Sequence, residues 1–384
     1  MRRFGGTLLL MIAMVTVSVN LRPAISSVPP LLDTIRAALG LSHAAAGLIT
    51  TIPVLLMGVV PAFAAMLAAR QGSERLVLAS VLLVGAGTLA RLVEAPAFLY
   101  LSSALCGIGI AAAQTLLPEI AKRRFGESAA LVMAIQACAM TAGAGLAAVL
   151  TPGLSASWSV ALAWWTAPAF VGAALWFVVA GAPKGAGDGT GPRFGFPFRS
   201  ALAWRITLFA AMSSAMFYTT LTWIPPTYAE AGWSSGETGG LLVVLSLAGM
   251  AASLALTWFA RHAGDRRWLL VGSVVLGAIG CAGLAVAPLA APWAWMVCVG
   301  LSTGAMFPLS LMLPVDYEDR PDALRRLSAM SLTGGYVLAA AGPVVFGWLR
   351  EGTGTYAVSY LILAGAAAAA SLMCLRFRPR SRVL

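Results

Sequence analysis

The chain has 384 residues, of which 60% are apolar and only 10% are charged, and its mean hydropathy is +0.87. Soluble globular domains carry roughly 25% charged residues, so this composition excludes that class and indicates an integral membrane protein. The formal net charge of +11 is divided among short clusters between apolar runs, which is not the pattern of a nucleic-acid-binding surface.

Twelve apolar runs are long enough to cross a bilayer as helices of about 20 residues. The first run follows Arg2 and Arg3 and is too long for the apolar core of a signal peptide, so we expect it to remain as the first helix. The expected helices cover residues 7–32, 43–69, 75–93, 97–121, 129–151, 159–182, 204–228, 239–260, 267–288, 292–315, 327–349 and 354–376.

The basic residues predict the topology. Twenty-one of the 25 Lys and Arg residues fall on one side of the expected helices, and Arg36, Arg91 and Arg350 fall on the other. Because basic residues concentrate in cytoplasmic loops, we expect both termini in the cytoplasm and the helices in a bacterial inner membrane. The remaining basic residue, Arg22, is the only one expected deep in the bilayer.

The chain divides into two related halves. A Gly- and Pro-rich stretch predicts an N-terminal bundle over 1–182, a cytoplasmic linker over 183–203 and a C-terminal bundle over 204–384. Pro29 and Pro30 recur 196 residues later as Pro225 and Pro226, and Pro118 recurs as Pro314 at the same offset. The sequence therefore predicts an all-α membrane protein of twelve transmembrane helices in two pseudo-symmetric six-helix bundles.

Metal and disulfide chemistry are not indicated. The five cysteines lie inside apolar runs and lack CxxC spacing, so we expect neither a disulfide framework nor a zinc site. We expect no cofactor. Only one acidic residue, Glu119, lies inside an expected helix, where a surface ion pair with Lys122 is the favoured interpretation over proton coupling. The scarcity of intramembrane carboxylates also argues against an enzyme.

Arg22 is the main candidate functional residue. An arginine at the centre of a membrane helix costs at least about 2.5 to 3.5 kcal/mol on insertion scales, so it usually faces a cavity or a bound anion. It lies about 15 residues into its helix, roughly 22 Å at 1.5 Å per residue, which disfavours snorkelling to a surface. A structural bond to a carbonyl of the helix broken near Pro23 is the alternative.

Several segments carry a resemblance to a known family. They are Asn20 to Pro23, Ser27 to Leu32, Thr51 to Val54, Met57-Gly58, Gln114, Pro118, Ile120 to Phe125, Leu162 to Trp165, Gly304 to Leu309 and Asp316. With twelve helices, a central linker and paired halves, the chain resembles the major facilitator superfamily, and these segments resemble the cyanate transporter and 2-nitroimidazole transporter subfamily. One departure is Ala69, which stands where the superfamily signature after helix two has an acidic residue, so its usual salt bridge is not carried over.

The resemblance implies that helices one, four, seven and ten surround a central cavity. Residues three or four apart share a helix face, which places further polar and aromatic candidates beside Arg22. For the amides an interhelical hydrogen bond, and for the aromatic residues simple packing, remain alternatives to substrate contact. The expected substrate-binding residues are Arg22, Asn20, Ser26, Gln114, Gln136, Tyr218, Thr222, Trp223, Phe307, Ser310 and Tyr336.

These features predict a secondary transporter that moves a small anionic or polar solute by rocking one half against the other. The resemblance makes cyanate the leading solute, and the alternative is export or exchange of a 2-nitroimidazole-like nitroaromatic or of another small anion. A channel is disfavoured because no pore-lining ring is evident. We expect a monomer. The prolines expected to kink or gate the helices are Pro29, Pro30, Pro118, Pro225, Pro226 and Pro314.

Overall fold

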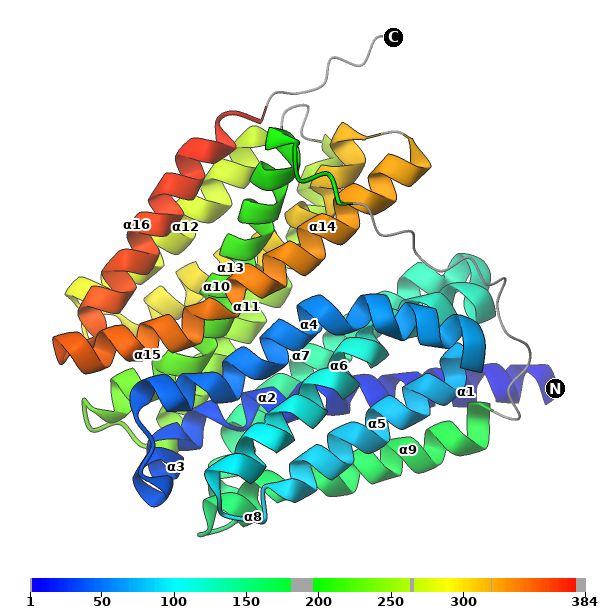
Figure 1. Cartoon of the computed structure of the whole chain (residues 1–384), viewed down its shortest axis with the longest axis horizontal. Coiled ribbons are helices and arrows are strands. Elements are labelled where there is room, and N and C mark those ends of the chain that lie inside the picture. Colours follow the sequence, from blue (N-terminus) through cyan, green and yellow to red (C-terminus); the bar gives the residue numbers. More distant parts are fainter. Residues whose placement is uncertain (1, 181–195, 263–265, 319, 378–384) are drawn as a thin grey trace. The chain divides into compact units, whose positions relative to one another are not determined.

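The computed structural model describes residues 2–180, 196–262, 266–318 and 320–377, and every regular element in them is helical (Figure 1). The first half of the described chain contains α1 (Arg2–Leu21), α2 (Pro23–Ser26), the 3₁₀ turns η1 (Pro29–Leu31) and η2 (Gly126–Ser128), α3 (Leu32–Leu39), α4 (His43–Gln71), α5 (Ser73–Ala90), α6 (Pro96–Phe125), α7 (Ala129–Leu154), α8 (Trp158–Ala163) and α9 (Thr166–Ala180). The second half contains α10 (Ala201–Ala229), α11 (Ser235–His262), α12 (Arg267–Val286), α13 (Pro292–Tyr317), α14 (Pro321–Ala339), α15 (Ala341–Thr353) and α16 (Tyr356–Cys374).

Each of the twelve expected runs corresponds to one helix or to a series of consecutive helices. In the described part of the chain, eleven stretches are long and apolar enough to cross a membrane, and α10, which covers the expected seventh run, lies outside that set. The expected linker falls mostly outside the described residues. Its last part is described, and α10 begins within it at Ala201.

The first run is broken rather than continuous. α1 ends at Leu21, and Pro23 begins the short α2. Pro29 and Pro30 then follow, and a proline supplies no backbone N–H for the helical ladder. The chain therefore continues through the 3₁₀ turn η1 before α3 resumes an α-helix at Leu32. Two other runs are also divided, between α8 and α9 and between α14 and α15.

The same proline pair has a different outcome in the second half. Pro225 and Pro226 lie inside α10, which continues unbroken to Ala229. The residue that corresponds to Pro23 at the 196-residue offset is Thr219, so the second half lacks the proline that begins the break. Pro118 and Pro314 both lie inside long helices, α6 and α13.

The described chain forms two compact units. The first contains Met1–Leu41, Leu48–Arg193 and Tyr228–Gly239, and the second contains Ser42–Gly47, Phe194–Thr227 and Gly240–Leu384. These units follow the two halves of the sequence, except that a short segment of each half packs with the other unit.

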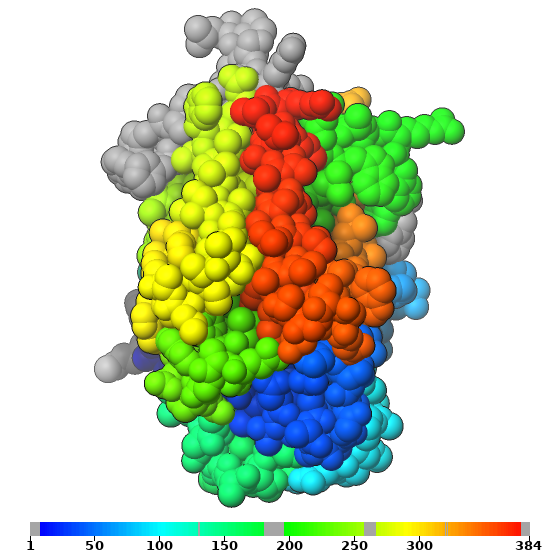
Figure 2. All heavy atoms as spheres, turned by 90° about the vertical axis from the view of Figure 1, so that its left-hand side faces the viewer, coloured from blue at the N-terminus to red at the C-terminus, as the bar shows by residue number. Residues whose placement is uncertain are grey.

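The packing order within the units repeats. In the first unit α5 packs against α6 and α9; in the second, α12 packs against α13 and α16. Figure 2 shows α12 in yellow beside α16 in red on one face of the second unit. α6 and α13 also begin at equivalent prolines, Pro96 and Pro292, at the 196-residue offset. The two units are therefore structural repeats, as the sequence predicts.

Close helix contacts depend on glycine. In the first unit a side chain at Gly143 on α7 would collide with the carbonyl oxygen of Val19 on α1. In the second unit a side chain at Gly304 on α13 would collide with the backbone of Gly249 on α11. Small residues let membrane helices approach until their backbones touch, which is the main source of packing energy in lipid.

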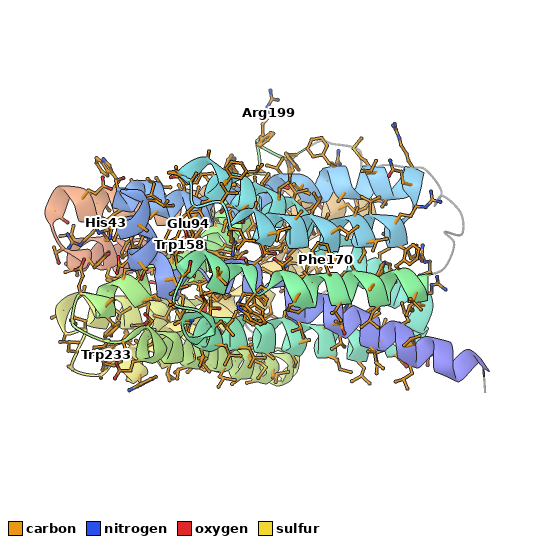
Figure 3. The ribbon with its side chains drawn as sticks, turned by 90° about the horizontal axis from the view of Figure 1, so that it is seen from below. His43, Glu94, Trp158, Phe170, Arg199 and Trp233 are labelled. Atoms are coloured by element: carbon orange, nitrogen blue, oxygen red, sulfur yellow. The ribbon has the colours of Figure 1, made fainter. Side chains whose placement is uncertain are left out.

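Polar contacts fasten the loop ends of the first unit. Glu94, in the loop after α5, accepts hydrogen bonds from the hydroxyl groups of Ser157 at 3.3 Å and Ser159 at 2.6 Å. Ser159 lies in the first turn of α8, next to Trp158, which is labelled with Glu94 in Figure 3. This contact joins the connection between α5 and α6 to the start of α8.

Candidate functional site

Arg22 lies at the break of the first helix. It is the single residue between α1 and α2, and it is partly buried. Its carbonyl oxygen accepts hydrogen bonds from the backbone N–H groups of Ile25 at 3.0 Å and Ser26 at 2.9 Å, which form the turn of α2. The charged residue therefore lies where the helix is interrupted before Pro23, although its own backbone stays in the right-handed helical region.

The two other candidates on this helix are buried. The side-chain amide of Asn20 donates to the carbonyl oxygen of Thr16 at 2.7 Å, one helical turn earlier. Asn20 also lies against Gly172 of α9, so it faces a helix of its own unit. Ser26 is 2% exposed and follows Arg22 on the turn of α2.

Two buried amide groups in the first unit lack a partner. Among the described residues, the Nε2 atoms of Gln114 on α6 and Gln136 on α7 are buried and make no hydrogen bond. A buried N–H group without an acceptor costs roughly 1 to 3 kcal/mol, so both positions favour a ligand or water that accepts a hydrogen bond.

The helix register places these amides at other depths than Arg22. Gly143 of α7 lies against Val19, and Gln136 precedes Gly143 by seven residues. Along parallel helices this puts Gln136 about 15 Å from Arg22 toward the start of α1. Cys106 of α6 lines the same pocket as Ala24, so the two residues lie at a similar level. Gln114 lies eight residues beyond Cys106, which places it about 9 Å from Arg22 along the helix axis, in the same direction as Gln136. The predicted residues of the first unit are therefore spaced along the helices and do not form one tight cluster.

In the second unit, aromatic residues gather around Tyr218. The ring centroids of Tyr218 on α10 and Tyr336 on α14 are 6.4 Å apart, and those of Phe217 and Tyr218 are 5.1 Å apart. The hydroxyl group of Thr222 donates to the carbonyl oxygen of Tyr218 at 2.7 Å. The predicted pair of Tyr218 and Tyr336 is thus brought together within one unit.

Trp223 belongs to a different aromatic cluster. Its indole N–H donates to the carbonyl oxygen of Pro343 at 2.9 Å, and its ring stacks on Phe346 at 5.9 Å and on His43 at 6.0 Å. The side chain is fully buried. These contacts give Trp223 a packing role in this conformation.

Phe307 and Ser310 share a face of α13. Phe307 is 40% exposed. The hydroxyl group of Ser310 donates to the carbonyl oxygen of Phe307 at 2.6 Å. Phe307 is therefore the aromatic candidate of this helix that a solute could contact.

Arg91 is a functional candidate that the sequence interpretation missed. The charge count placed it outside the helices, and Arg91 does lie in the turn directly after α5. What the count missed is that only 1% of its surface is exposed. Its guanidinium group lies inside the first unit, so Arg22 is not the only basic residue in the interior. Its place within the expected run 75–93 was a signal that could have revealed this burial.

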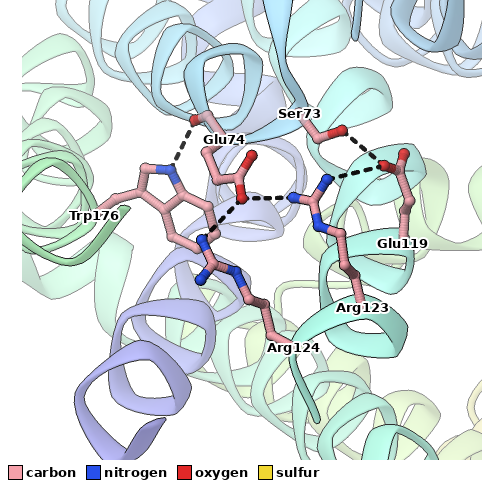
Figure 4. Close-up of polar contacts among 6 residues, drawn as sticks. All are labelled: Ser73, Glu74, Glu119, Arg123, Arg124 and Trp176. Atoms are coloured by element: carbon pink, nitrogen blue, oxygen red, sulfur yellow. Dashed lines mark hydrogen bonds and ion pairs between the residues drawn. The ribbon is translucent and has the colours of Figure 1, made fainter. Parts of the chain in front are cut away.

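The start of α5 holds a cluster of ion pairs (Figure 4). The carboxylate of Glu74 accepts from Arg123 at 2.5 Å and from Arg124 at 3.2 Å. The Trp176 indole of α9 donates to the backbone carbonyl oxygen of Glu74 at 2.9 Å. Ala69 stands where the superfamily signature has an acidic residue. Glu74, five residues later at the start of α5, supplies a carboxylate close to that position in the sequence.

Glu119 lies at the edge of this cluster. Its carboxylate accepts from the Ser73 hydroxyl at 2.8 Å and lies 3.8 Å from Arg123. The expected ion pair on the surface of α6 is present, but its partner is Arg123 instead of Lys122. The second unit has a related pair of reversed sign, in which Arg266 at the start of α12 binds Asp316 near the end of α13.

Replacing Glu74 with Ala should lower the free energy of unfolding by about 1 to 2 kcal/mol, because it leaves two half-exposed arginines without their shared carboxylate. The side chain of Glu74 is 9% exposed and that of Glu119 is 53% exposed, so Glu119→Ala is a matched control with a smaller expected effect. Thermal unfolding in detergent measures both. Equal losses in the two variants would contradict the central position of Glu74.

No metal centre is evident in the described ranges, where no group of three His, Cys, Asp or Glu side chains could hold an ion. The functional features are instead apolar helices, two repeated units and polar side chains in the interior of each. These features define a multi-pass membrane protein with the architecture of a transporter.

Comparison with known proteins agrees with that class. The family model of the Major Facilitator Superfamily matches residues 7–320, and the chain belongs to this family. The protein is thus a membrane transporter of the major facilitator type. A crystal structure of the nucleoside transporter NupG superposes with a TM-score of 0.79, at 14% identity, over 95% of this chain and 99% of that one.

Two relatives from Escherichia coli strain K12 are similar over nearly the whole length. The cyanate transport protein CynX is 32% identical over 96% of this chain and 97% of its own. The 2-nitroimidazole transporter is 31% identical over 91% of this chain and 90% of its own. The resemblance noted from the sequence motifs is confirmed.

Proposed function

We propose that the protein is a secondary transporter of a small anion, with cyanate as the leading substrate, and that Arg22 is its central anion-binding residue. The observation that supports this most directly is the place of Arg22 on a short turn between α1 and α2, where the first helix is broken. Broken membrane helices are the usual place for solute sites in secondary transporters.

The chemistry of the first unit favours an anion. Arg22 supplies a permanent positive charge, and the unpartnered Nε2 atoms of Gln114 on α6 and Gln136 on α7 supply N–H donors in the same unit. A guanidinium group neutralises a monovalent anion and can donate two parallel hydrogen bonds to it. A small linear anion such as cyanate can be accepted at each of these positions in turn.

The aromatic residues of the second unit favour the alternative. A nitroaromatic ring of the kind that the 2-nitroimidazole transporter carries could stack on Phe307 or on the pair of Tyr218 and Tyr336. We keep this substrate class as the second candidate, with export or exchange as its direction of transport.

The proposal includes a topology and a mechanism. Both termini lie in the cytoplasm of a bacterial cell whose inner membrane holds the helices, since basic residues concentrate on that side. Residues 1–182 and 204–384 act as two halves that alternate between opening to either side. The prolines at positions 29, 30, 118, 225, 226 and 314 mark the points where helices bend. The functional unit is a monomer with no cofactor and no catalytic step.

A binding screen with purified protein tests the substrate class. A ligand that binds only the folded state, and whose concentration is 100 times its Kd, stabilises that state by about 2.7 kcal/mol. We expect cyanate to raise the melting temperature, and nitrate, bicarbonate and small carboxylates to raise it less. Stabilisation by 2-nitroimidazole but not by cyanate would overturn the cyanate assignment in favour of the alternative.

A control is needed because cyanate carbamylates lysine side chains. The chain has only two lysines, Lys122 and Lys184, so their replacement with Arg removes this reaction with little change of charge. The expected shift persists in that variant and disappears after the ligand is removed by buffer exchange. A shift that remains after exchange would indicate covalent modification rather than binding.

A further inference from the structure

Arg91 makes three hydrogen bonds inside the first unit. Its Nε donates to the Ser102 hydroxyl of α6 at 2.8 Å, its Nη2 donates to the carbonyl oxygen of Ala24 at 2.6 Å, and its Nη1 lies 3.4 Å from the Ser27 hydroxyl. No carboxylate pairs with it in the part of the chain that the structure describes. Its acceptors therefore come from α6 and from the broken segment of the first helix.

The broken segment explains why the carbonyl oxygen of Ala24 is available. In a regular helix this oxygen would accept from the N–H group of Val28, four residues later. Here the Val28 N–H group donates instead to Ile25 at 3.4 Å, in the tighter pattern that leads into Pro29. Without Arg91, the carbonyl oxygen of Ala24 would be a buried acceptor with no donor, and the guanidinium group of Arg91 supplies that donor.

The segment held by Arg91 is the one that carries Arg22. The carbonyl oxygen of Arg22 accepts from Ile25 and Ser26, so residues 22–26 form one turn. Arg91 binds the middle of this turn at Ala24 and lies beside its end at Ser27. Because a guanidinium group has a fixed planar geometry, it fixes the position of the turn relative to α6.

The packing around the turn is not complete on the side of Arg91. A small pocket with room for about one water molecule lies beside it. The pocket is bounded by Ala24, Ile25 and Val28 of the broken segment and by Arg91 and Ser103, among others. The Ser103 hydroxyl is buried without a hydrogen-bond partner, although it neighbours Ser102, which binds Arg91.

We propose that Arg91 is a positioning residue for transport: it holds the broken segment of the first helix and thereby sets the position of Arg22. This inference rests on the proposed role of Arg22 in anion binding. It predicts that a change at Arg91 alters solute affinity although the hydrogen bonds of Arg91 go to Ala24, Ser27 and Ser102.

Two measurements on Arg91→Lys test the proposal. Hydrogen exchange of the backbone amides of Ile25 to Val28, Leu31 and Leu32 should become about tenfold faster, because a lysine cannot reach Ala24, Ser27 and Ser102 together. The Kd for cyanate should rise about tenfold in the same variant. Ser102→Ala, which removes one of the three bonds and perturbs the fold less, should change both quantities in the same direction by a smaller factor.

Ser103→Ala is the matched control, because it removes a hydroxyl group from the same pocket without removing a bond to Arg91. It should leave exchange and affinity unchanged. Faster exchange in Arg91→Lys and Ser102→Ala with unaltered cyanate affinity would overturn the positioning role, and so would unaltered exchange in both. If the wild-type protein binds no cyanate, the proposed function fails, while the exchange measurement still decides whether Arg91 holds the turn.

Discussion

Replacing Arg22 with Gln should abolish cyanate transport and raise the Kd for cyanate by at least about 30-fold, since removing one partner of a desolvated charge pair costs about 2 to 5 kcal/mol. Gln keeps hydrogen-bonding capacity and a similar stem length but carries no charge. The loss therefore reports the electrostatic contribution of the guanidinium group. Equilibrium binding to purified protein measures the affinity directly.

The behaviour of Arg22→Lys separates charge from geometry. A lysine keeps the charge but cannot donate two parallel hydrogen bonds, so we expect an affinity between those of the wild type and Arg22→Gln. Arg22→Gln should not lower the melting temperature without ligand, because removing an interior charge tends to relieve a desolvation penalty. Wild-type affinity in Arg22→Gln would show that the anion binds elsewhere.

Replacing Gly304 with Leu should prevent stable folding of the second unit. A side chain at this position would enter the backbone of Gly249, and backbone atoms cannot move aside as a flexible side chain can. Overpacking of a core typically costs 1 to 3 kcal/mol, and a collision with a backbone lies at or above the upper end of that range, about 3 kcal/mol. Yield of monodisperse protein and its melting temperature are the measurements.

Gly272 provides the matched control for this prediction. It lies on α12 of the same unit, and a side chain built there meets no atom within 4 Å. Gly272→Leu should therefore fold with nearly the wild-type melting temperature. Similar instability in both variants would mean that loss of a membrane glycine, rather than the contact between α11 and α13, is responsible.

Sequence reasoning anticipated the helices and the repeat for physical reasons. A membrane helix must be apolar over a length fixed by the bilayer, so its residues are visible in sequence without knowledge of its neighbours. The prolines at positions 29, 30 and 118 recur 196 residues later because the two halves share one architecture. The equivalent starts of α6 and α13 agree with that offset.

The interior contacts were not predictable in the same way. Arg91 resembles a loop residue because it directly follows α5, and only the folded chain brings the freed carbonyl oxygen of Ala24 to it. Glu74 was likewise not recognised as the partner of Arg123 and Arg124, because these arginines lie 49 and 50 residues after it in the sequence. Such pairings depend on how helices pack, which composition and periodicity do not specify.

The central claim is that this protein is a carrier for a small anion that binds at Arg22. The most direct test is counterflow of labelled cyanate in proteoliposomes, with wild-type protein and Arg22→Gln compared at equal incorporation. We predict saturable uptake that unlabelled cyanate inside the vesicles accelerates, and its loss in Arg22→Gln. Flux that does not saturate, or equal counterflow by both proteins, would contradict the account.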